Sequence, residues 1–125
     1  MSLEKERGLK MLNTLAMLGK VKKLPEIVSL GDGFGEAYME LEVDEPFRCE
    51  DGSLGSCVFE VKLWRGIAHD CIHICRLGDL ISLKGRLHTR KIEVNGKEVD
   101  HTYVIAEQVS FVTKRVEALQ NMKKE

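Results

Sequence analysis

The sequence lacks any long apolar run. No window of the 125 residues comes near the roughly 18 consecutive apolar residues that a membrane-spanning helix needs, so we expect no transmembrane helix. The first ten residues, MSLEKERGLK, mix acidic and basic side chains and no apolar block follows them. They therefore do not resemble a secretory signal. We expect a cytoplasmic protein that does not associate with membranes.

Signatures of catalysis are also missing. The sequence has no Gly-rich phosphate loop. Its Ser, His and Asp residues show no spacing that would bring a nucleophile, a base and an orienting acid together. We therefore expect no enzymatic activity and no cofactor.

An excess of charge of one sign is missing from the chain as a whole, because the formal net charge is −1. The distribution of charge is uneven, however. Residues 24–60 contain one basic and ten acidic side chains, whereas residues 61–92 contain seven basic and two acidic ones. Local fields of this kind govern the choice of partner more than the net charge does.

Cysteine is scarce, with four residues at Cys49, Cys57, Cys71 and Cys75. The segment HDCIHIC (69–75) contains metal-ligand residue types, but on a helix Cys71 and Cys75 share one side. His69 and His73 share another side, about 200° away. Four ligands cannot converge from these positions, so we expect reduced, packed thiols and no metal site.

Hydrophobic periodicity predicts five strands. Strict alternation of apolar and polar residues marks 36–44 and 57–65 as half-buried strands. A strand over 12–24, closed by Pro25, precedes them. The Asn95-Gly96 pair is typical of a two-residue hairpin turn, and it joins a strand over 80–92 to a return strand over 99–112.

Two segments repeat apolar residues at helical spacing. Residues 66–79 predict a helix with Gly78 as its C-terminal stop. Residues 113–125 predict a short amphipathic helix with Thr113 as N-cap and Val116, Leu119 and Met122 as its apolar line. Residues 29–35, with three glycines and an aspartate, predict a turn, and residues 45–56 predict a polar loop that contains Phe47.

The resulting order is strand, strand, strand, helix, strand, strand, which is the order expected of an OB-fold barrel. We therefore predict a mainly all-β protein whose residues 12–112 form a five-stranded OB-fold Greek-key barrel. An N-terminal arm (1–11) precedes the barrel, and a short C-terminal helix or tail (113–125) follows it. The alternative is another small barrel, or a sandwich with one inserted helix.

One face of the predicted fourth strand carries a row of positive side chains. In an OB barrel the outer side of strands two and three, together with the connecting loops, is the usual surface for single strands. Cations there neutralise phosphates, and aromatic rings stack on bases. The candidate nucleic-acid-binding residues are Phe47, Lys62, Trp64, Lys84, Arg86, His88, Arg90 and Ile92.

Other interpretations of these residues stay open. A charged outward face is often only solvated, and Trp64 can also cap a barrel. The outward side of 36–44 is acidic and would repel phosphate if it shared the groove; it consists of Glu36, Glu40, Glu42 and Asp44.

Three segments resemble the bacterial single-stranded DNA-binding protein family. LNTLAMLGKV (12–21) is similar to the family's opening strand, and FEVKLWRGIAH (59–69) to its third strand running into the helix. GDLISLKGRLHTRKIEVNGK (78–97) resembles the family's Gly-x-x-Val-x-Val-x-Gly-x-Leu-x-Thr-Arg segment and the following hairpin. The likeness covers roughly 13–112, with the three pieces in order at family spacing.

This resemblance implies an OB fold, a homotetramer or dimer, and sequence-tolerant binding of single-stranded DNA in replication, recombination or repair. Family stacking positions fall on Phe47, Val58, Trp64 and Ile92, of which only Phe47 and Trp64 are aromatic here. Family basic positions on the long hairpin fall on Arg86, His88 and Arg90. Glu60 stands where the family usually has a base.

The sequence also departs from the family at its last residues, LQNMKKE. The family usually ends in an acidic tip with a Phe, which recruits replication and repair proteins, so we do not expect such partners to bind through a tip of this kind. A dimeric, tail-less primosomal replication protein of related OB type is a close variant. The other alternative is an OB-type interaction module with weak or lost DNA affinity, and preference for DNA over RNA is undetermined.

Overall fold

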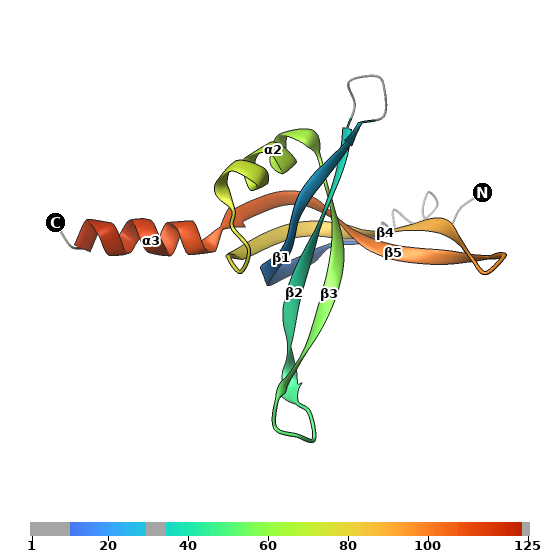
Figure 1. Cartoon of the computed structure of the whole chain (residues 1–125), viewed down its shortest axis with the longest axis horizontal. Coiled ribbons are helices and arrows are strands. Elements are labelled where there is room, and N and C mark those ends of the chain that lie inside the picture. Colours follow the sequence, from blue (N-terminus) through green and yellow to red (C-terminus); the bar gives the residue numbers. More distant parts are fainter. Residues whose placement is uncertain (1–10, 30–34, 124–125) are drawn as a thin grey trace.

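The computed structural model describes residues 11–29 and 35–123. Five strands form a closed barrel with neighbours in the order β1-β2-β3-β5-β4. Helix α2 (Arg65–Ile74) lies between β3 and β4, and helix α3 (Val112–Lys123) follows β5 (Figure 1). The predicted five-stranded OB-fold barrel with its inserted helix is confirmed. The strands are β1 (Leu15–Ser29), β2 (Gly35–Arg48), β3 (Leu54–Leu63), β4 (Leu80–Val94) and β5 (Lys97–Phe111).

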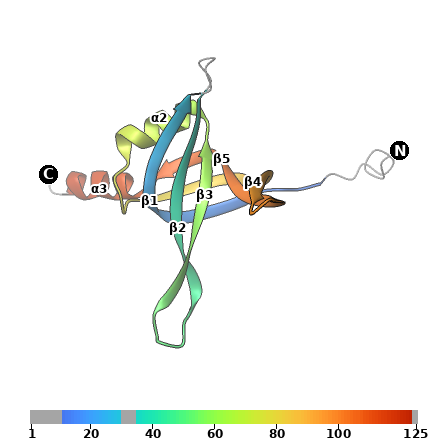
Figure 2. The same ribbon diagram turned by 45° about the vertical axis from the view of Figure 1, so that its right-hand side comes forward.

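The barrel closes through a short contact. β3 and β5 run parallel and pair only through Val61 with Val104 and Lys62 with Ile105. The other four strand pairs are antiparallel and longer. Beyond this closure, the β2–β3 hairpin and the β4–β5 hairpin leave the barrel in different directions (Figures 1 and 2).

The core consists of one side of every strand and one side of α2. Met39, Leu41 and Val61 are fully buried, together with Ala68 and Cys71 of α2, which packs over one end of the barrel. Burying a large aliphatic side chain stabilises the fold by roughly 1.5–3 kcal/mol. The alternation of β2 therefore fixes its orientation, because a slip of one residue would turn these side chains outward.

The first strand is longer than its sequence pattern predicts. Pro25 was expected to close it, but β1 continues to Ser29. Its register with β2 shifts between Lys23 and Glu26, so the proline occupies an irregular position where a ladder hydrogen bond is not required. Gly19 lies where β1 changes partner from β4 to β2, and a Cβ there would come within 2.9 Å of the Glu42 carbonyl oxygen.

The two hairpins differ in how well the sequence predicted them. Both residues of the predicted Asn95-Gly96 turn have positive φ, 51° and 78°, as a two-residue hairpin turn requires. Residues 45–56 are not an open loop, because β2 extends to Arg48 and β3 begins at Leu54. Phe47 therefore lies on a strand. Of the predicted turn at 29–35, residues 30–34 lie outside the described residues.

Both helices depart from their predicted ends. α2 ends at Ile74, and Gly78 adopts its positive φ in the turn that follows. Thr113 does not precede α3 but lies within it, and its hydroxyl oxygen accepts a hydrogen bond from the Leu80 N–H at 2.7 Å. α3 extends away from the barrel with none of its residues buried (Figure 1). Of the predicted N-terminal arm (1–11), residues 1–10 lie outside the described residues.

Candidate nucleic-acid interface

The outward sides of β2, β3, β5 and β4 form one surface, here called the strand face. Tyr38 of β2 is paired with Lys62 of β3, and Lys62 is paired with Ile105 of β5. Arg86 of β4 is the antiparallel partner of the same Ile105. Since neighbouring strands lie about 4.8 Å apart, Lys62 and Arg86 are roughly 10 Å apart across the face.

Arg90 connects the two hairpins across this face. Its Nη1 donates to the Tyr38 hydroxyl oxygen at 3.0 Å, and its Nη2 donates to Glu60 Oε1 at 3.0 Å. The guanidinium carbon lies 5.2 Å from the centroid of the Tyr38 ring and 5.1 Å from that of Tyr103. Arg90 thus combines an ion pair with cation–π contacts to two rings.

Lys62 is held in a similar way on β3. Its Nζ lies 3.0 Å from Glu36 Oε1, and the Tyr38 hydroxyl donates to Glu36 Oε2 at 2.8 Å. The hydrogen bonds from Lys62 and Tyr38 lower the pKa of Glu36. Burial, followed by the Glu36 carboxylate, raises the pKa of Tyr38 to about 12, so at neutral pH this hydroxyl remains protonated and donates.

These contacts form one chain of interactions, here called the cross-strand network. It runs from Lys62 through Glu36, Tyr38 and Arg90 to Glu60, and His101 Nε2 of β5 lies 3.7 Å from the second Glu60 oxygen. The network contains two cations and two carboxylates. Two candidate DNA-binding cations, Lys62 and Arg90, are therefore neutralised by residues of the same face.

Trp64 is accessible at the upper end of β3. It occupies the N-cap position of α2 in an extended conformation, and 55% of its surface is exposed. Lys62 Nζ lies 5.7 Å from the centroid of the indole ring. Since the indole is not buried in the barrel, it is available to stack on a base.

Phe47 is also accessible, at 61% exposure, but it lies far from Trp64. It precedes Arg48, the partner of Leu54 at the start of β3, whereas Trp64 follows the last residue of β3. At about 3.3 Å per residue, this separates the two aromatic side chains by roughly 30 Å. Residues 44–51 around Phe47 contain four acidic side chains and one basic one.

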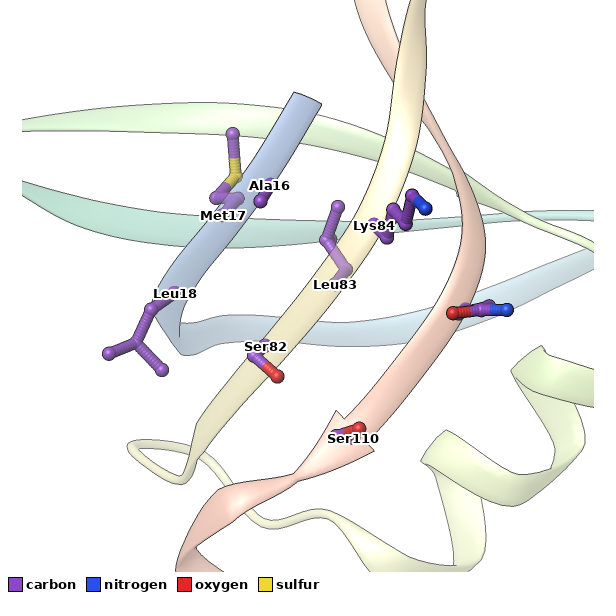
Figure 3. Close-up of a pocket in the computed structure, with 8 residues that line it drawn as sticks. Ala16, Met17, Leu18, Ser82, Leu83, Lys84 and Ser110 are labelled. Carbon is purple, nitrogen blue, oxygen red and sulfur yellow. The ribbon is translucent and has the colours of Figure 1, made fainter. Parts of the chain in front are cut away.

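The row along β4 has the predicted alternation, but its members have different surroundings. Lys84 lines an open hollow of about 500 Å³ with Ala16 and Leu18 of β1 and Ser110 of β5 (Figure 3). His88 packs edge-on against the Tyr103 ring, at 5.5 Å between centroids. In the part of the chain that the structure describes, neither Lys84 nor Arg86 forms an ion pair. Ile92 is half-buried opposite Val99, on the β4–β5 hairpin.

Sequence reasoning missed Tyr38 and Tyr103 as parts of this surface. Tyr38 stood on the acidic side of its strand, and Tyr103 was not singled out. The Asn95-Gly96 turn could have revealed Tyr103, since its two-residue geometry fixes the register that pairs Tyr103 with His88. Tyr103 is only 6% exposed, so it supports Arg90 and does not itself offer a stacking surface.

The His residues of α2 lie on the side opposite to Cys71 and to Cys75, the residue that follows the helix. His69 and His73 are exposed, with ring centroids 4.4 Å apart, whereas Cys71 and Cys75 are buried. Burial raises the pKa of the Cys71 thiol to about 12. Over residues 11–29 and 35–123, no three His, Cys, Asp or Glu side chains gather in a way that could hold a metal ion.

None of the helices in the described part of the chain has the length and apolar character needed to cross a membrane.

Comparison with solved structures finds the same fold. The chain of a structure described as a Plasmodium falciparum SSB complex with ssDNA superimposes with a TM-score of 0.68 and 24% sequence identity, covering 82% of this chain and 94% of the other. A small single-stranded DNA-binding protein from Streptomyces coelicolor gives a TM-score of 0.64 at 19% identity, covering 84% and 99%. These likenesses show the barrel architecture.

Comparison of sequences is more specific. Single-stranded DNA-binding protein 3 of Listeria innocua is 31% identical over 103 residues, which are 82% of this chain and 64% of that protein. Single-stranded DNA-binding protein B of Bacillus subtilis is 29% identical over 103 residues, which are 82% of this chain and 91% of that protein. The chain thus spans just under two thirds of the length of several relatives. The model of the single-strand binding protein family matches residues 12–112, and the chain belongs to this family.

Proposed function

We propose that the chain binds single-stranded DNA with little sequence preference and without catalysis, through the strand face. The observation that carries this proposal is the exposed Trp64 indole, next to Lys62 and on the same surface as Arg86 and Arg90. An indole stacks on any base, and cations on one surface neutralise successive phosphates. The names of the relatives from Listeria innocua and Bacillus subtilis support the same function.

Each candidate residue has a definite part in this proposal. Trp64 stacks on a base, and Lys84 and Arg86 contact phosphates. Lys62 and Arg90 reach phosphates only after exchanging their carboxylate partners. His88 and Ile92 line the path along β4. Phe47 is roughly 30 Å from Trp64 by the length of β3, so it contacts only DNA that is long enough to follow the β2–β3 hairpin.

We also propose that the protein is a cytoplasmic homo-oligomer, dimer or tetramer, that acts with replication, recombination or repair proteins. Self-association is what the resemblance to the single-strand binding protein family implies.

The test is a titration with oligo(dT). Trp64 is the single tryptophan of the chain, so quenching of the intrinsic indole fluorescence reports on this position alone. We expect saturable quenching that weakens as salt rises. Anisotropy of a labelled oligonucleotide gives an independent reading for variants without Trp64. Unchanged fluorescence and anisotropy at low salt would refute the proposal.

A second candidate is an OB-type interaction module with weak DNA affinity. It is favoured by the two ion pairs, Glu36 with Lys62 and Glu60 with Arg90, and by the acidic residues 44–51. This candidate predicts weak or undetectable oligo(dT) binding at low salt while the protein is folded. Binding that disappears in the Trp64→Ala variant would count against it.

A further inference from the structure

We propose that Glu60 is an internal competitor of the DNA phosphate for Arg90, and that it thereby sets the affinity of the strand face for single-stranded DNA. The inference rests on the proposed function and adds a residue that weakens DNA binding. Arg90 is neutralised by Glu60 in the free protein and must exchange this carboxylate for a phosphate when DNA binds.

The geometry of Arg90 explains why this exchange is possible. Its Nη2 meets a single Glu60 oxygen at 3.0 Å, and the second Glu60 oxygen faces His101 at 3.7 Å. The pair is therefore not the bidentate arrangement that guanidinium groups form with carboxylates and phosphates. Both side chains are about one-third exposed, 39% for Arg90 and 32% for Glu60, so a phosphate can approach from solvent.

The Arg90–Glu60 pair also connects the two hairpins of the barrel. Arg90 belongs to the β4–β5 hairpin, whereas Glu60 and Tyr38 belong to the β2–β3 hairpin. The backbones of the two hairpins pair only at the two residue pairs between β3 and β5. A cleft of about 460 Å³ adjoins these pairs, since its lining includes Val104 together with Glu60 and His101. The Arg90 contacts therefore span the line along which the hairpins separate.

Exchange of partners has a measurable signature in salt dependence. Salt weakens the contact between Arg90 and the DNA phosphate, but it also screens the competing Arg90–Glu60 ion pair, so the two effects oppose each other. Arg90 then contributes little to the salt slope of the wild-type protein. In Glu60→Gln, Arg90 is free beforehand, so the slope of log K against log salt becomes steeper, by at most about 0.7.

The first experiment compares Glu60→Gln with Glu40→Gln. Glu40 is the direct cross-strand partner of Glu60, and within the described residues it forms no ion pair. The two variants thus remove the same charge from neighbouring positions. In oligo(dT) titrations at about 50 mM salt, we expect Glu60→Gln to bind about three- to tenfold tighter than wild type. Glu40→Gln should gain less than about twofold, because it frees no cation.

A double-mutant cycle separates this mechanism from simple repulsion between Glu60 and phosphate. In the Arg90→Gln background, Glu60→Gln should improve binding no more than Glu40→Gln does. An equal gain with and without Arg90 would overturn the proposal. Thermal unfolding of each variant establishes that it is folded.

Tyr38→Phe provides a test without any change of charge. It removes the hydroxyl that accepts from Arg90 Nη1 and leaves Glu60 in place. We expect tighter oligo(dT) binding by about twofold, since Arg90 loses one of its two side-chain hydrogen bonds. Unchanged or weaker binding by Tyr38→Phe would contradict the proposal. This test remains valid even if Glu60→Gln does not fold.

The outcomes distinguish the two levels of the argument. If wild type and all variants fail to bind oligo(dT), the proposed function fails and the role of Glu60 falls with it. If wild type binds but Glu60→Gln behaves like Glu40→Gln, the proposed function stands and Glu60 is no competitor.

Discussion

The salt dependence of oligo(dT) binding by the wild-type protein follows from the ion pairs of the strand face. Four basic side chains with permanent charge are candidates for phosphate contact: Lys62, Lys84, Arg86 and Arg90. Lys62 and Arg90 each lie 3.0 Å from a carboxylate oxygen, whereas within the described residues Lys84 and Arg86 form no ion pair. Only for Lys84 and Arg86 is the salt-sensitive contact with phosphate not opposed by salt screening of a competing ion pair.

These numbers give a definite slope. For single strands, log K falls with log salt by about 0.7 per phosphate neutralised, so two cations give a slope of about −1.4. Between 50 and 200 mM salt, affinity should then fall about sevenfold. If all four cations were free, the slope would be about −2.8 and the loss about fiftyfold.

The assay uses an oligo(dT) of about eight nucleotides, within the size that one OB fold covers, so that the slope refers to one protomer. Fluorescence of Trp64 is followed at about pH 8, where an ordinary histidine is uncharged. A slope near −2.8 would show that the carboxylates do not hold Lys62 and Arg90. A slope near zero would show that the strand face does not contact phosphates.

Three further predictions concern single residues. Trp64→Ala should weaken binding of a short oligo(dT) by about 1–3 kcal/mol, whereas Phe47→Ala should leave it nearly unchanged, as anisotropy will show. Gly85→Ala should lower the free energy of unfolding by more than about 2 kcal/mol, because the added Cβ would collide with the backbone of β5. Gly66→Ala should not destabilise the protein, because Gly66 lies in α2 with open space around it. Equal free energies of unfolding of the two variants in urea titrations would contradict this prediction. The pKa of Glu36 is lowered in the folded state, so its stabilising contribution is present above its ordinary pKa of 4.5 and is lost as pH falls through the lowered pKa. The difference in the free energy of unfolding between wild type and Glu36→Gln should therefore shrink below about pH 4.5. A difference that stays constant down to about pH 3 would refute this prediction.

The barrel was predictable because each strand carries its orientation in its own alternation. Met39 and Leu41 face the core, and Glu40 between them faces outward, as period-two patterning requires. The end of β1 was mispredicted because Pro25 breaks a regular ladder but fits an irregular one, which no local pattern reveals. The sequence predicts a loop around Phe47 because polar side chains dominate there. The β2–β3 hairpin extends away from the barrel, so its strands can carry polar side chains on both faces.

The composition of the strand face was only partly predictable. Alternation places Arg90 and Glu60 on outward sides, but their contact depends on β3 and β5 closing the barrel between segments about forty residues apart in sequence. Neutralisation of Lys62 by Glu36 likewise depends on the register of β2 against β3. The sequence therefore indicates which residues are available for phosphates, while lateral pairing determines which of them are already occupied.

The central claim is that single-stranded DNA lies on the strand face beside Trp64. Two-dimensional ¹H–¹⁵N spectra recorded during addition of oligo(dT) test it most directly, because the indole N–H of the single tryptophan gives one recognisable signal. We predict shifts of this signal and of the amide signals of Lys62, Arg86 and His88. An indole signal that stays in place while oligo(dT) binds, with shifts confined to α2 or α3, would contradict the account.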